Sequence, residues 1–231
     1  MKYVISDIHG MYKQYVKMLK LISFSDDDEL YIIGDVIDRG DGGVKILRSI
    51  MQHPNMHMLL GNHELMALEA IKASLINKPR YMSLWLKHNG GDVTYKNLIN
   101  LPKWEYNKTV EFLENLPVSM EVEAGGRKFY LVHGFPADNV MDAVWKRPDC
   151  NTPRPFEDKT LIIGHTPVFY FHGNNDYDVN DYIFNLRAAK EHFKIEHAEG
   201  FIGIDCGCCA GLPESRLACL RLDDMEEFYV S

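Results

Sequence analysis

Six short apolar runs recur along the chain, and at the end of each stands a glycine or serine next to a residue that can bind a metal or a phosphate. Short runs of β-favouring residues without polar alternation are typical of strands that are buried on both faces. The runs cover residues 3–5, 30–33, 56–60, 129–132, 161–163 and 201–204. The chain is therefore predicted to form a sheet-based core with polar residues where the strands end.

Segments with helical periodicity follow the first three runs. Apolar residues return at every third or fourth position in residues 12–19, 44–50 and 65–75. Such alternation of strand and helix builds an α/β fold in which helices cover a sheet, and ligands then bind beyond the carboxyl ends of the strands. Asp7 to Asp35 is 28 residues and Asp35 to Asn62 is 27, close to the ~30 residues of one strand–helix–strand unit.

The middle of the chain departs from this alternation. Residues 76–117 are rich in aromatic and polar side chains and have a new helical pattern, so we interpret them as a small helical insertion. Residues 118–132 and 217–230 each contain two β-favouring runs around a turn and predict two hairpins. Residues 169–200 have no clear pattern. Because no Pro/Ser/Gly-rich tether separates these parts, residues 1–231 are expected to form a single domain.

Net charge and hydropathy exclude several classes of protein. The 25 Lys and Arg residues against 33 Asp and Glu residues give a formal charge of -8, which argues against a nucleic-acid-binding or membrane-surface protein. No apolar stretch approaches the ~20 residues that a membrane-spanning helix needs, and the first residues lack the pattern of a secretion signal. We therefore expect a soluble, cytoplasmic protein.

The five cysteines are an odd number, and three of them crowd together after the sixth run, at Cys206, Cys208 and Cys209. Such a set suits reduced thiols better than a disulfide framework. Two interpretations remain open. Thiols beside a metal site can have a lowered pKa and act as a redox switch, or they can be inert side chains in a buried turn.

The polar residues at the strand ends combine oxygen and nitrogen ligands. They include Asp7, His9, Asp35, Asn62, His133 and His165. Six ligands are more than one tetrahedral ion requires, and they suit two divalent ions that share a bridging carboxylate. Carboxylate and amide oxygens together with imidazoles favour Mn²⁺, with Fe or Zn²⁺ as alternatives. A single histidine here would more often be structural, whereas six positions together indicate a metal centre.

These residues occur in motifs that resemble a known family. The motifs are Asp7-Ile8-His9-Gly10, Gly34-Asp35-Val36-Ile37-Asp38-Arg39-Gly40, Gly61-Asn62-His63-Glu64, His133-Gly134 and Gly164-His165-Thr166-Pro167. In order and spacing they resemble the phosphoprotein phosphatase branch of the calcineurin-like metallophosphoesterases. Residues 85–91, 116–117 and 145–147 are further similar to the small bacterial and bacteriophage serine/threonine protein phosphatases. The resemblance implies a metallophosphoesterase-type β-sandwich flanked by helices, and a metal-dependent phosphomonoesterase activity.

The resemblance also divides the predicted ligands between two metals. It implies that the first metal is bound by Asp7 and His9, that Asp35 bridges, and that the second is bound by Asn62, His133 and His165. A hydroxide that bridges the two cations would then attack phosphorus in line, without a covalent phosphoenzyme.

Four further residues receive catalytic roles from the resemblance. Arg39 and Arg147 would bind the phosphoryl oxygens, because a guanidinium group matches phosphate geometry and stays charged. His63 would be the general acid that protonates the leaving oxygen, and Asp38 would orient it.

One position departs from the family pattern. The protein phosphatases of this branch usually have an arginine immediately before Gly-Asn-His-Glu, and this chain has Leu60. Relatives of the symmetrical diadenosine tetraphosphate hydrolases also have an apolar residue there, but they tend to lack the aspartate that is Asp38 here. We therefore expect a serine/threonine protein phosphatase that acts on a phosphorylated protein or a small phosphoester. The alternatives are a symmetrical dinucleoside polyphosphate hydrolase and, more remotely, a non-catalytic metal-binding regulatory module.

Overall fold

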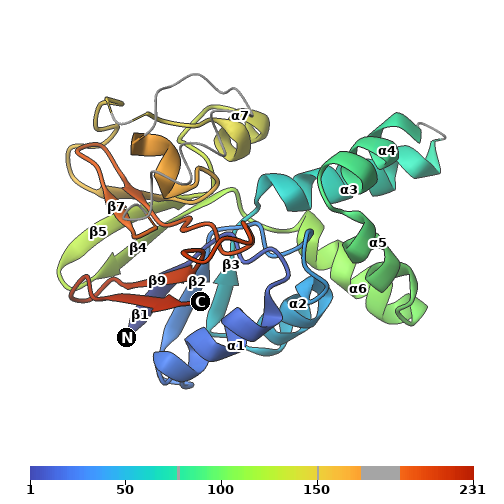
Figure 1. The fold of residues 1–231 in the computed structure, drawn as a ribbon, viewed down its shortest axis with the longest axis horizontal. Helices are drawn as coiled ribbons and strands as arrows, with labels where there is room; N and C mark the ends of the chain where they lie inside the picture. The colour runs from blue at the N-terminus through green and yellow to red at the C-terminus, as the bar shows by residue number, and fades with distance from the viewer. Residues whose placement is uncertain (77–78, 150, 173–192) are drawn as a thin grey trace.

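The computed structural model describes residues 1–76, 79–149, 151–172 and 193–231, and these residues form two five-stranded sheets (Figure 1). The first has the order β10-β9-β1-β2-β3 and consists of β1 (Lys2–Ile5), β2 (Glu29–Ile32), β3 (Met56–Met58), β9 (Leu217–Arg221) and β10 (Glu227–Val230). The second has the order β4-β5-β6-β8-β7 and consists of β4 (Ser119–Ala124), β5 (Arg127–Val132), β6 (Thr160–Ile163), β7 (Glu196–His197) and β8 (Ile202–Gly203). Each of the six apolar runs supplies one strand, as predicted.

The first three strands are parallel and are linked by helices. α1 (Tyr12–Leu21) connects β1 to β2, and α2 (Gly43–Gln52) connects β2 to β3. Tyr3 pairs with Leu30 and Leu30 with Met56, so the three strands run side by side in the same direction. Their carboxyl ends consequently lie at the same edge of the sheet, as the alternation of strand and helix predicts.

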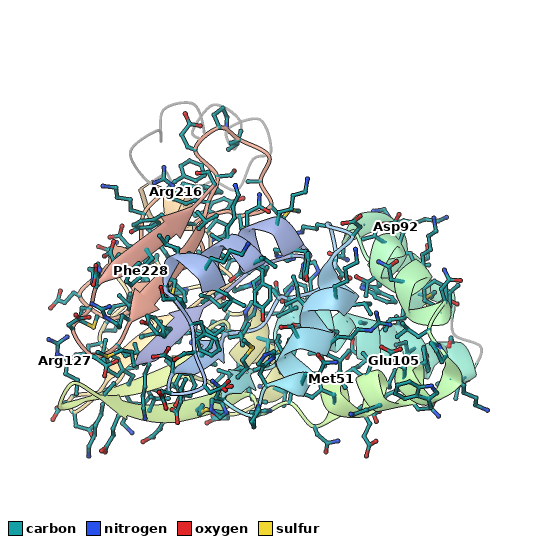
Figure 2. All side chains as sticks on the ribbon, turned by 90° about the horizontal axis from the view of Figure 1, so that it is seen from below. Met51, Asp92, Glu105, Arg127, Arg216 and Phe228 are labelled. Atoms are coloured by element: carbon teal, nitrogen blue, oxygen red, sulfur yellow. The ribbon has the colours of Figure 1, made fainter. Side chains whose placement is uncertain are left out.

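Successive residues of β1 point into two different cores. Tyr3 and Ile5 belong to a core that includes residues of α1 and α2, whereas Val4 belongs to a core with Leu131 and other residues of the second sheet. Because neighbouring side chains of a strand point to opposite faces, the first sheet is covered by helices on one face and by the second sheet on the other. Figure 2 shows α1 and α2 lying across the outer face. The expected helix-flanked β-sandwich is confirmed.

The helical insertion lies beside α2 (Figure 1). It follows α3 (Asn62–Leu75) and contains α4 (Pro79–His88), α5 (Asp92–Ile99) and α6 (Lys103–Glu114). α3 packs against α4 and α6, while α5 and α6 pack against α2. Arg48 of α2 forms an ion pair with Glu105 of α6, which is labelled in Figure 2. The insertion is therefore joined to the sandwich through α2 and α3.

Both predicted hairpins are present. The turn between β4 and β5 is Gly125-Gly126, whose φ values of 55° and 72° are those that a two-residue type I′ turn requires. β9 and β10 pair in antiparallel fashion. The remaining elements are α7 (Val140–Trp145) and the 3₁₀ helix η1 (Val168–His172).

Most of the polar stretch 169–200 lies outside the described residues, which resume at residue 193. None of the helices in the described ranges combines the length and the apolar character that crossing a membrane demands.

Candidate active site

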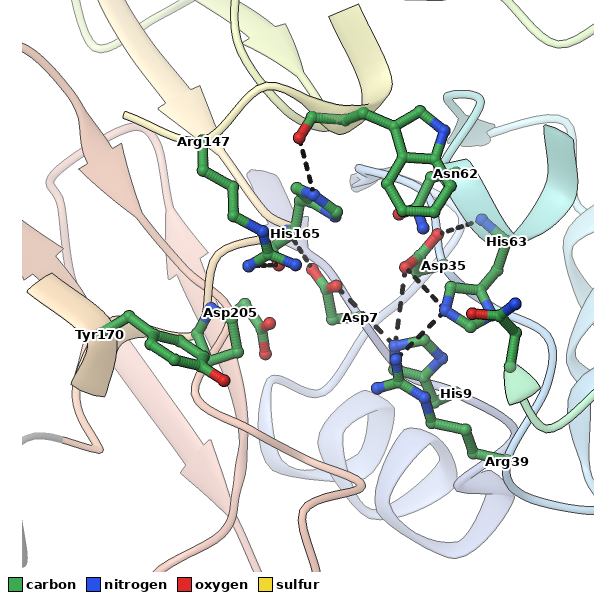
Figure 3. A pocket seen from close by; sticks show the side chains of 13 residues that line it. Asp7, His9, Asp35, Arg39, Asn62, His63, Arg147, His165, Tyr170 and Asp205 are labelled. Carbon is green, nitrogen blue, oxygen red and sulfur yellow. Dashed lines mark hydrogen bonds and ion pairs between the residues drawn. The ribbon is translucent and has the colours of Figure 1, made fainter. Parts of the chain in front are cut away.

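A pocket opens where the carboxyl ends of strands from both sheets meet (Figure 3). The loops after β1, β2 and β3 supply one side, and residues after α7, β6 and β8 supply the other. The pocket is lined by Asp7, His9, Asp35, Arg39, Asn62, His63, Asn89, Trp145, Arg147, His165, Pro167, Tyr170 and Asp205. Five of the six predicted metal ligands are among them. The sixth, His133, is fully buried and lies against Asp35.

Asp35 stands between two groups of nitrogen donors. Its Oδ2 lies 3.6 Å from His9 Nε2 and 3.9 Å from His63 Nε2, whereas its Oδ1 lies 3.3 Å from His133 Nε2. One compact group of donor atoms therefore comprises His9, Asp35 and His63, and a second comprises Asp35, His133 and His165. A carboxylate shared by two donor groups is the arrangement that a bridging ligand between two cations needs.

Backbone carbonyl groups fix the orientation of two of these histidines. His133 Nδ1 lies 2.7 Å from the carbonyl oxygen of Ile33, and His9 Nδ1 lies 3.1 Å from that of Ile37. A carbonyl only accepts hydrogen bonds, so each Nδ1 carries a proton and each Nε2 is directed at Asp35. Such contacts are typical of metal-binding histidines, because they set the tautomer and the ring orientation.

Asp7 and Asn62 complete the predicted ligand set from the two edges of the pocket. Asp7 Oδ2 accepts hydrogen bonds from the Ser6 hydroxyl at 2.5 Å and from the His165 backbone N–H at 3.0 Å. Its other oxygen, Oδ1, lies 3.9 Å from His9 Nε2. Asn62 Oδ1 lies 2.9 Å from His133 Nε2. All six predicted ligands are thus brought together.

The protonation states of these groups suit divalent cations. Burial lowers the pKa of His9 well below its ordinary value and that of His165 to about 2, so both are neutral and able to donate a lone pair. Burial raises the pKa of Asp35, but the neighbouring histidines, His133 first, outweigh it and keep Asp35 ionised. Burial likewise opposes the charge on His133, but Asp35 raises its pKa to about 10. The proton that His133 holds beside Asp35 is the one that a metal cation would replace on binding. The donor set therefore fits metal binding.

Six residues of the site have left-handed backbone conformations. They are Asp7, His9, Asp35, Asp38, Arg39 and His165, with φ between 46° and 69°. Non-glycine residues rarely adopt positive φ, and they keep it only where the surrounding contacts fix it. Strain concentrated at these positions indicates that the loops are shaped for function.

His63 lies at the rim of the metal-ligand cluster with its two ring nitrogens in different surroundings. Nδ1 is 2.8 Å from Asp38 Oδ2, and Nε2 is 3.2 Å from Arg39 Nη2 (Figure 3 shows His63 and Arg39). Burial lowers the pKa of His63, but Asp35 and the hydrogen bond to Asp38 outweigh burial and raise it above its ordinary value. The ring is therefore held by Asp38 with its other nitrogen toward the pocket.

Both predicted phosphate-binding arginines reach the pocket. In Figure 3, Arg39 and Arg147 enter it from different sides. Arg147 Nη1 donates to the carbonyl oxygen of His165 at 2.9 Å. An anion in the pocket would thus meet two guanidinium groups. Leu60, by contrast, is buried in the core that includes α1 and α2 and does not line the pocket.

Several residues of the site were not predicted from the sequence, and three of them contact or adjoin the predicted ones. Glu64 is buried, and its carboxylate accepts backbone N–H groups from Asp35 at 2.8 Å and from Val36 at 2.9 Å. Asp205 lines the pocket, and burial, followed by the charge of Asp7, raises its pKa to about 8. The third is Trp85, which contacts Asp38. Asp205 directly follows the sixth apolar run, and that position was the one signal that could have identified it.

The clustered cysteines lie beside the pocket. Arg39 Nη1 donates to Cys209 Sγ at 3.1 Å, and Cys206 is buried. Burial raises the pKa of Cys206, Cys208 and Cys209 above the ordinary thiol value. Burial thus disfavours the thiolates of the metal-free protein, and both interpretations, the redox switch and the inert buried turn, stay predictions.

A family model for calcineurin-like phosphoesterases matches residues 3–197. Serine/threonine-protein phosphatase 2 of Salmonella typhimurium is 32% identical over 141 residues, which is 61% of this chain and 61% of that protein. A symmetrical bis(5'-nucleosyl)-tetraphosphatase of Salmonella paratyphi B is 35% identical over 80 residues, which is 34% of this chain and 28% of that protein. The chain therefore matches less than two thirds of the length of either relative.

The fold and the shared-carboxylate donor set together define a metal-dependent phosphoesterase architecture. The fold also resembles the crystal structure of a protein described as a putative diadenosine tetraphosphatase, with a TM-score of 0.65 and 17% identity over 99% of this chain and 92% of that one. Identity this low shows a common fold. Because the family model covers most of the sequence, the chain belongs to the calcineurin-like phosphoesterase family, as its motifs predict.

Proposed function

We propose that this chain is a metal-dependent phosphomonoesterase that hydrolyses phosphoserine and phosphothreonine in proteins. The observation that supports it most is the position of the His63–Asp38 pair, directly beside Asp35 and Arg39 in one pocket. This arrangement places a proton donor and an anion-binding group next to a donor set that fits divalent cations. The match to serine/threonine-protein phosphatase 2 supports the protein-substrate class, because it is almost twice as long as the match to the tetraphosphatase.

The proposed cofactor is a pair of divalent cations, with Mn²⁺ preferred by the mixed oxygen and nitrogen donors. One cation would be held by Asp7, His9 and Asp35, and the other by Asp35, Asn62, His133 and His165. When bound, such ions supply Lewis-acid charge and lower the pKa of a water molecule.

The protein groups then bind and orient the substrate. Arg39 and Arg147 bind the phosphoryl oxygens, because the planar guanidinium fork matches phosphate geometry. The attacking water releases one proton to solvent, and its oxygen forms the new bond to phosphorus while the bond to the leaving oxygen breaks. His63 gives its Nε2 proton to that leaving oxygen, and Asp38 keeps the ring in place through Nδ1. No protein side chain becomes phosphorylated.

A symmetrical dinucleoside polyphosphate hydrolase is the second candidate. Leu60 favours it, because the arginine that the protein phosphatases usually have at this position is absent. The local 35% identity to a symmetrical tetraphosphatase supports it as well. Asp38 argues for the first candidate, since those hydrolases tend to lack this aspartate.

A direct comparison of substrates tests the proposal. Metal-stripped protein is reloaded with Mn²⁺ and assayed on a phosphoserine peptide and on diadenosine tetraphosphate under the same conditions. The proposal expects a higher kcat/KM for the peptide. A clear preference for the dinucleotide would replace it with the second candidate. Absence of turnover on both substrates and on an aryl phosphate, with two metals bound, would favour the non-catalytic regulatory module.

A further inference from the structure

Asp38 has a second hydrogen-bond partner besides His63. The indole Nε1 of Trp85 donates to Asp38 Oδ2 at 2.8 Å, and this is the same oxygen that faces His63 Nδ1 at 2.8 Å. Trp85 is 1% exposed and Asp38 is 0% exposed. Asp38 Oδ1 has no hydrogen-bond partner among the described residues. The direction of the carboxylate is therefore set by two donors on one oxygen, and Trp85 supplies one of them.

The same part of the insertion also holds the backbone of the loop after β2 that carries Asp38 and Arg39, here called the catalytic loop. The N–H of Asp38 donates to Thr94 Oγ1 at 2.9 Å, and the N–H of Arg39 donates to the carbonyl oxygen of Gly90 at 2.9 Å. Asp38 and Arg39 have φ values of 69° and 67°, which non-glycine residues keep only under the constraint of their surroundings. Residues 85–94 provide hydrogen-bond acceptors for both backbone N–H groups.

Two glycines allow this close approach. A Cβ on Gly91 would lie 2.3 Å from Trp85 Nε1, and a Cβ on Gly90 would lie 3.1 Å from Arg39 Cγ. Gly91 has a helical backbone conformation with φ of -78°, so the turn itself does not require glycine there. Glycine is required there because the Trp85 indole occupies the space that a Cβ would need. The Asn89-Gly90-Gly91 sequence is thus explained by contact with the catalytic loop as well as by the turn.

We infer that residues 85–94 of the insertion are a positioning element for the general-acid step. Trp85 fixes the Asp38 carboxylate, and Asp38 in turn keeps the His63 ring with Nε2 toward the pocket. Packing alone explains why Trp85 is buried, but it does not explain why the indole N–H points at the one carboxylate that orients His63. This inference rests on the proposed phosphomonoesterase function.

The first test replaces Trp85 with phenylalanine, which keeps an aromatic ring and removes the N–H donor. We expect kcat on phenyl phosphate, which has a poor leaving group, to fall about tenfold. On 4-nitrophenyl phosphate, which needs little protonation, we expect a change of less than about twofold, with KM unchanged on both substrates. The matched control is Trp104→Phe in the same insertion, where the side chain is 68% exposed and no change is expected. Unchanged kcat, or equal losses on both substrates, would overturn the inference.

Further variants separate positioning from loss of packing. Gly91→Ala should displace the indole and reproduce the leaving-group dependence of Trp85→Phe. Adding Trp85→Phe to Asp38→Asn should cause little further loss on phenyl phosphate, because both changes act through the same contact. Losses that multiply in the double variant would contradict the inference.

The backbone contact has its own pair of variants. Thr94→Val removes the acceptor for the Asp38 N–H, whereas Thr94→Ser keeps it and should restore activity. Thr109→Val is the matched control, because Thr109 is equally buried and its hydroxyl donates only within α6, to the carbonyl oxygen of Glu105. Equal behaviour of the Val and Ser variants at position 94 would count against the role of this contact.

A measurement without turnover keeps this inference separate from the proposed function. The His63 Nδ1 proton is observed by NMR in the wild-type protein and in the Trp85→Phe and Trp104→Phe variants. We expect a slowly exchanging signal in the wild type and Trp104→Phe, and a shifted or fast-exchanging one in Trp85→Phe. If the wild type hydrolyses no phosphomonoester, the proposed function fails. An identical signal in all three proteins would show that Trp85 does not position His63.

Discussion

Arg39 Nη2 lies 3.2 Å from His63 Nε2. A guanidinium group has only donors, so in this arrangement Nε2 accepts and the ring proton is on Nδ1, toward Asp38. A phosphoryl group bound by Arg39 would take up these N–H donors and release Nε2. The freed Nε2 would then bind the proton that it later gives to the leaving oxygen, because Asp35 and Asp38 outweigh burial and raise the pKa of His63. Binding of the anion is therefore coupled to the availability of the nitrogen that protonates the leaving group.

The first prediction concerns this nitrogen. His63→Asn should lower kcat by about 10²–10⁴-fold on substrates with poor leaving groups, because general-acid catalysis contributes that much. On substrates with good leaving groups, kcat should fall much less. The measurement is kcat on a series of aryl phosphates of graded leaving-group pKa. A uniform loss along the series would mean that His63 acts on binding or on the metals instead.

The second prediction concerns the shared carboxylate. Asp35→Asn should reduce the bound metal from two ions per chain to one or none, because Asp35 faces both donor groups. Metal content after dialysis against limiting Mn²⁺ is the measurement, and exposed Asp138→Asn is the control with no expected change. Two tightly bound ions in the Asp35→Asn protein would contradict the bridging role.

The positions of most strands could be predicted because their signal is local. An apolar run followed by a glycine and a polar residue is visible within five or six positions, and all six runs form strands. Element boundaries depend on distant partners and were less accurate. The run 56–60 predicts a longer strand, whereas β3 ends at Met58. The N–H of Leu60 donates to the carbonyl oxygen of Pro117 and not to β2.

The start of α3 also differs from the predicted one, for a physical reason. Apolar periodicity predicts the helix from residue 65, whereas it begins at Asn62, because the Glu64 carboxylate accepts the Gly61 N–H at 3.1 Å and caps the first turn. In the site, motif residues were found because each follows a strand. The role of Trp85 was not found, because its partner Asp38 is 47 residues away and no local sequence pattern indicates the contact.

The third prediction concerns the contribution of His165 to the stability of the metal-free protein at acid pH. The pKa of His165 is about 2 in the folded state and about 6.5 in an unfolded chain. Below pH 6.5 the unfolded state therefore takes up a proton at His165 that the folded state does not, and the contribution of His165 to stability falls as the pH falls. Between pH 7 and pH 5 this one group should cost on the order of 2 kcal/mol. Urea unfolding in EDTA measures the change in stability between the two pH values, and the difference between the wild type and His165→Asn gives the contribution of His165. We expect the change in His165→Asn to be more favourable at pH 5 by about 2 kcal/mol. Equal changes in the two proteins would mean that His165 is not held neutral.

The fourth prediction concerns Glu64, which joins the loops after β2 and β3. One carboxylate oxygen accepts N–H groups from Asp35 and Gly61, and the other accepts from Val36 and Ile37. Glu64→Gln keeps the shape of the side chain but turns an amide NH₂ toward one of these pairs of donors.

The cost of the substitution follows from that mismatch. Buried donors left without an acceptor should lower the free energy of unfolding by about 1–3 kcal/mol, and the loosened Asp35 loop should weaken metal binding. Urea unfolding in EDTA and Mn²⁺ titration measure the two effects separately. Glu69→Gln, on the partly exposed side of the same helix, is the matched control and should match the wild type in both. A Glu64→Gln protein that is as stable and binds Mn²⁺ as tightly as Glu69→Gln would show that the carboxylate does not set the position of Asp35.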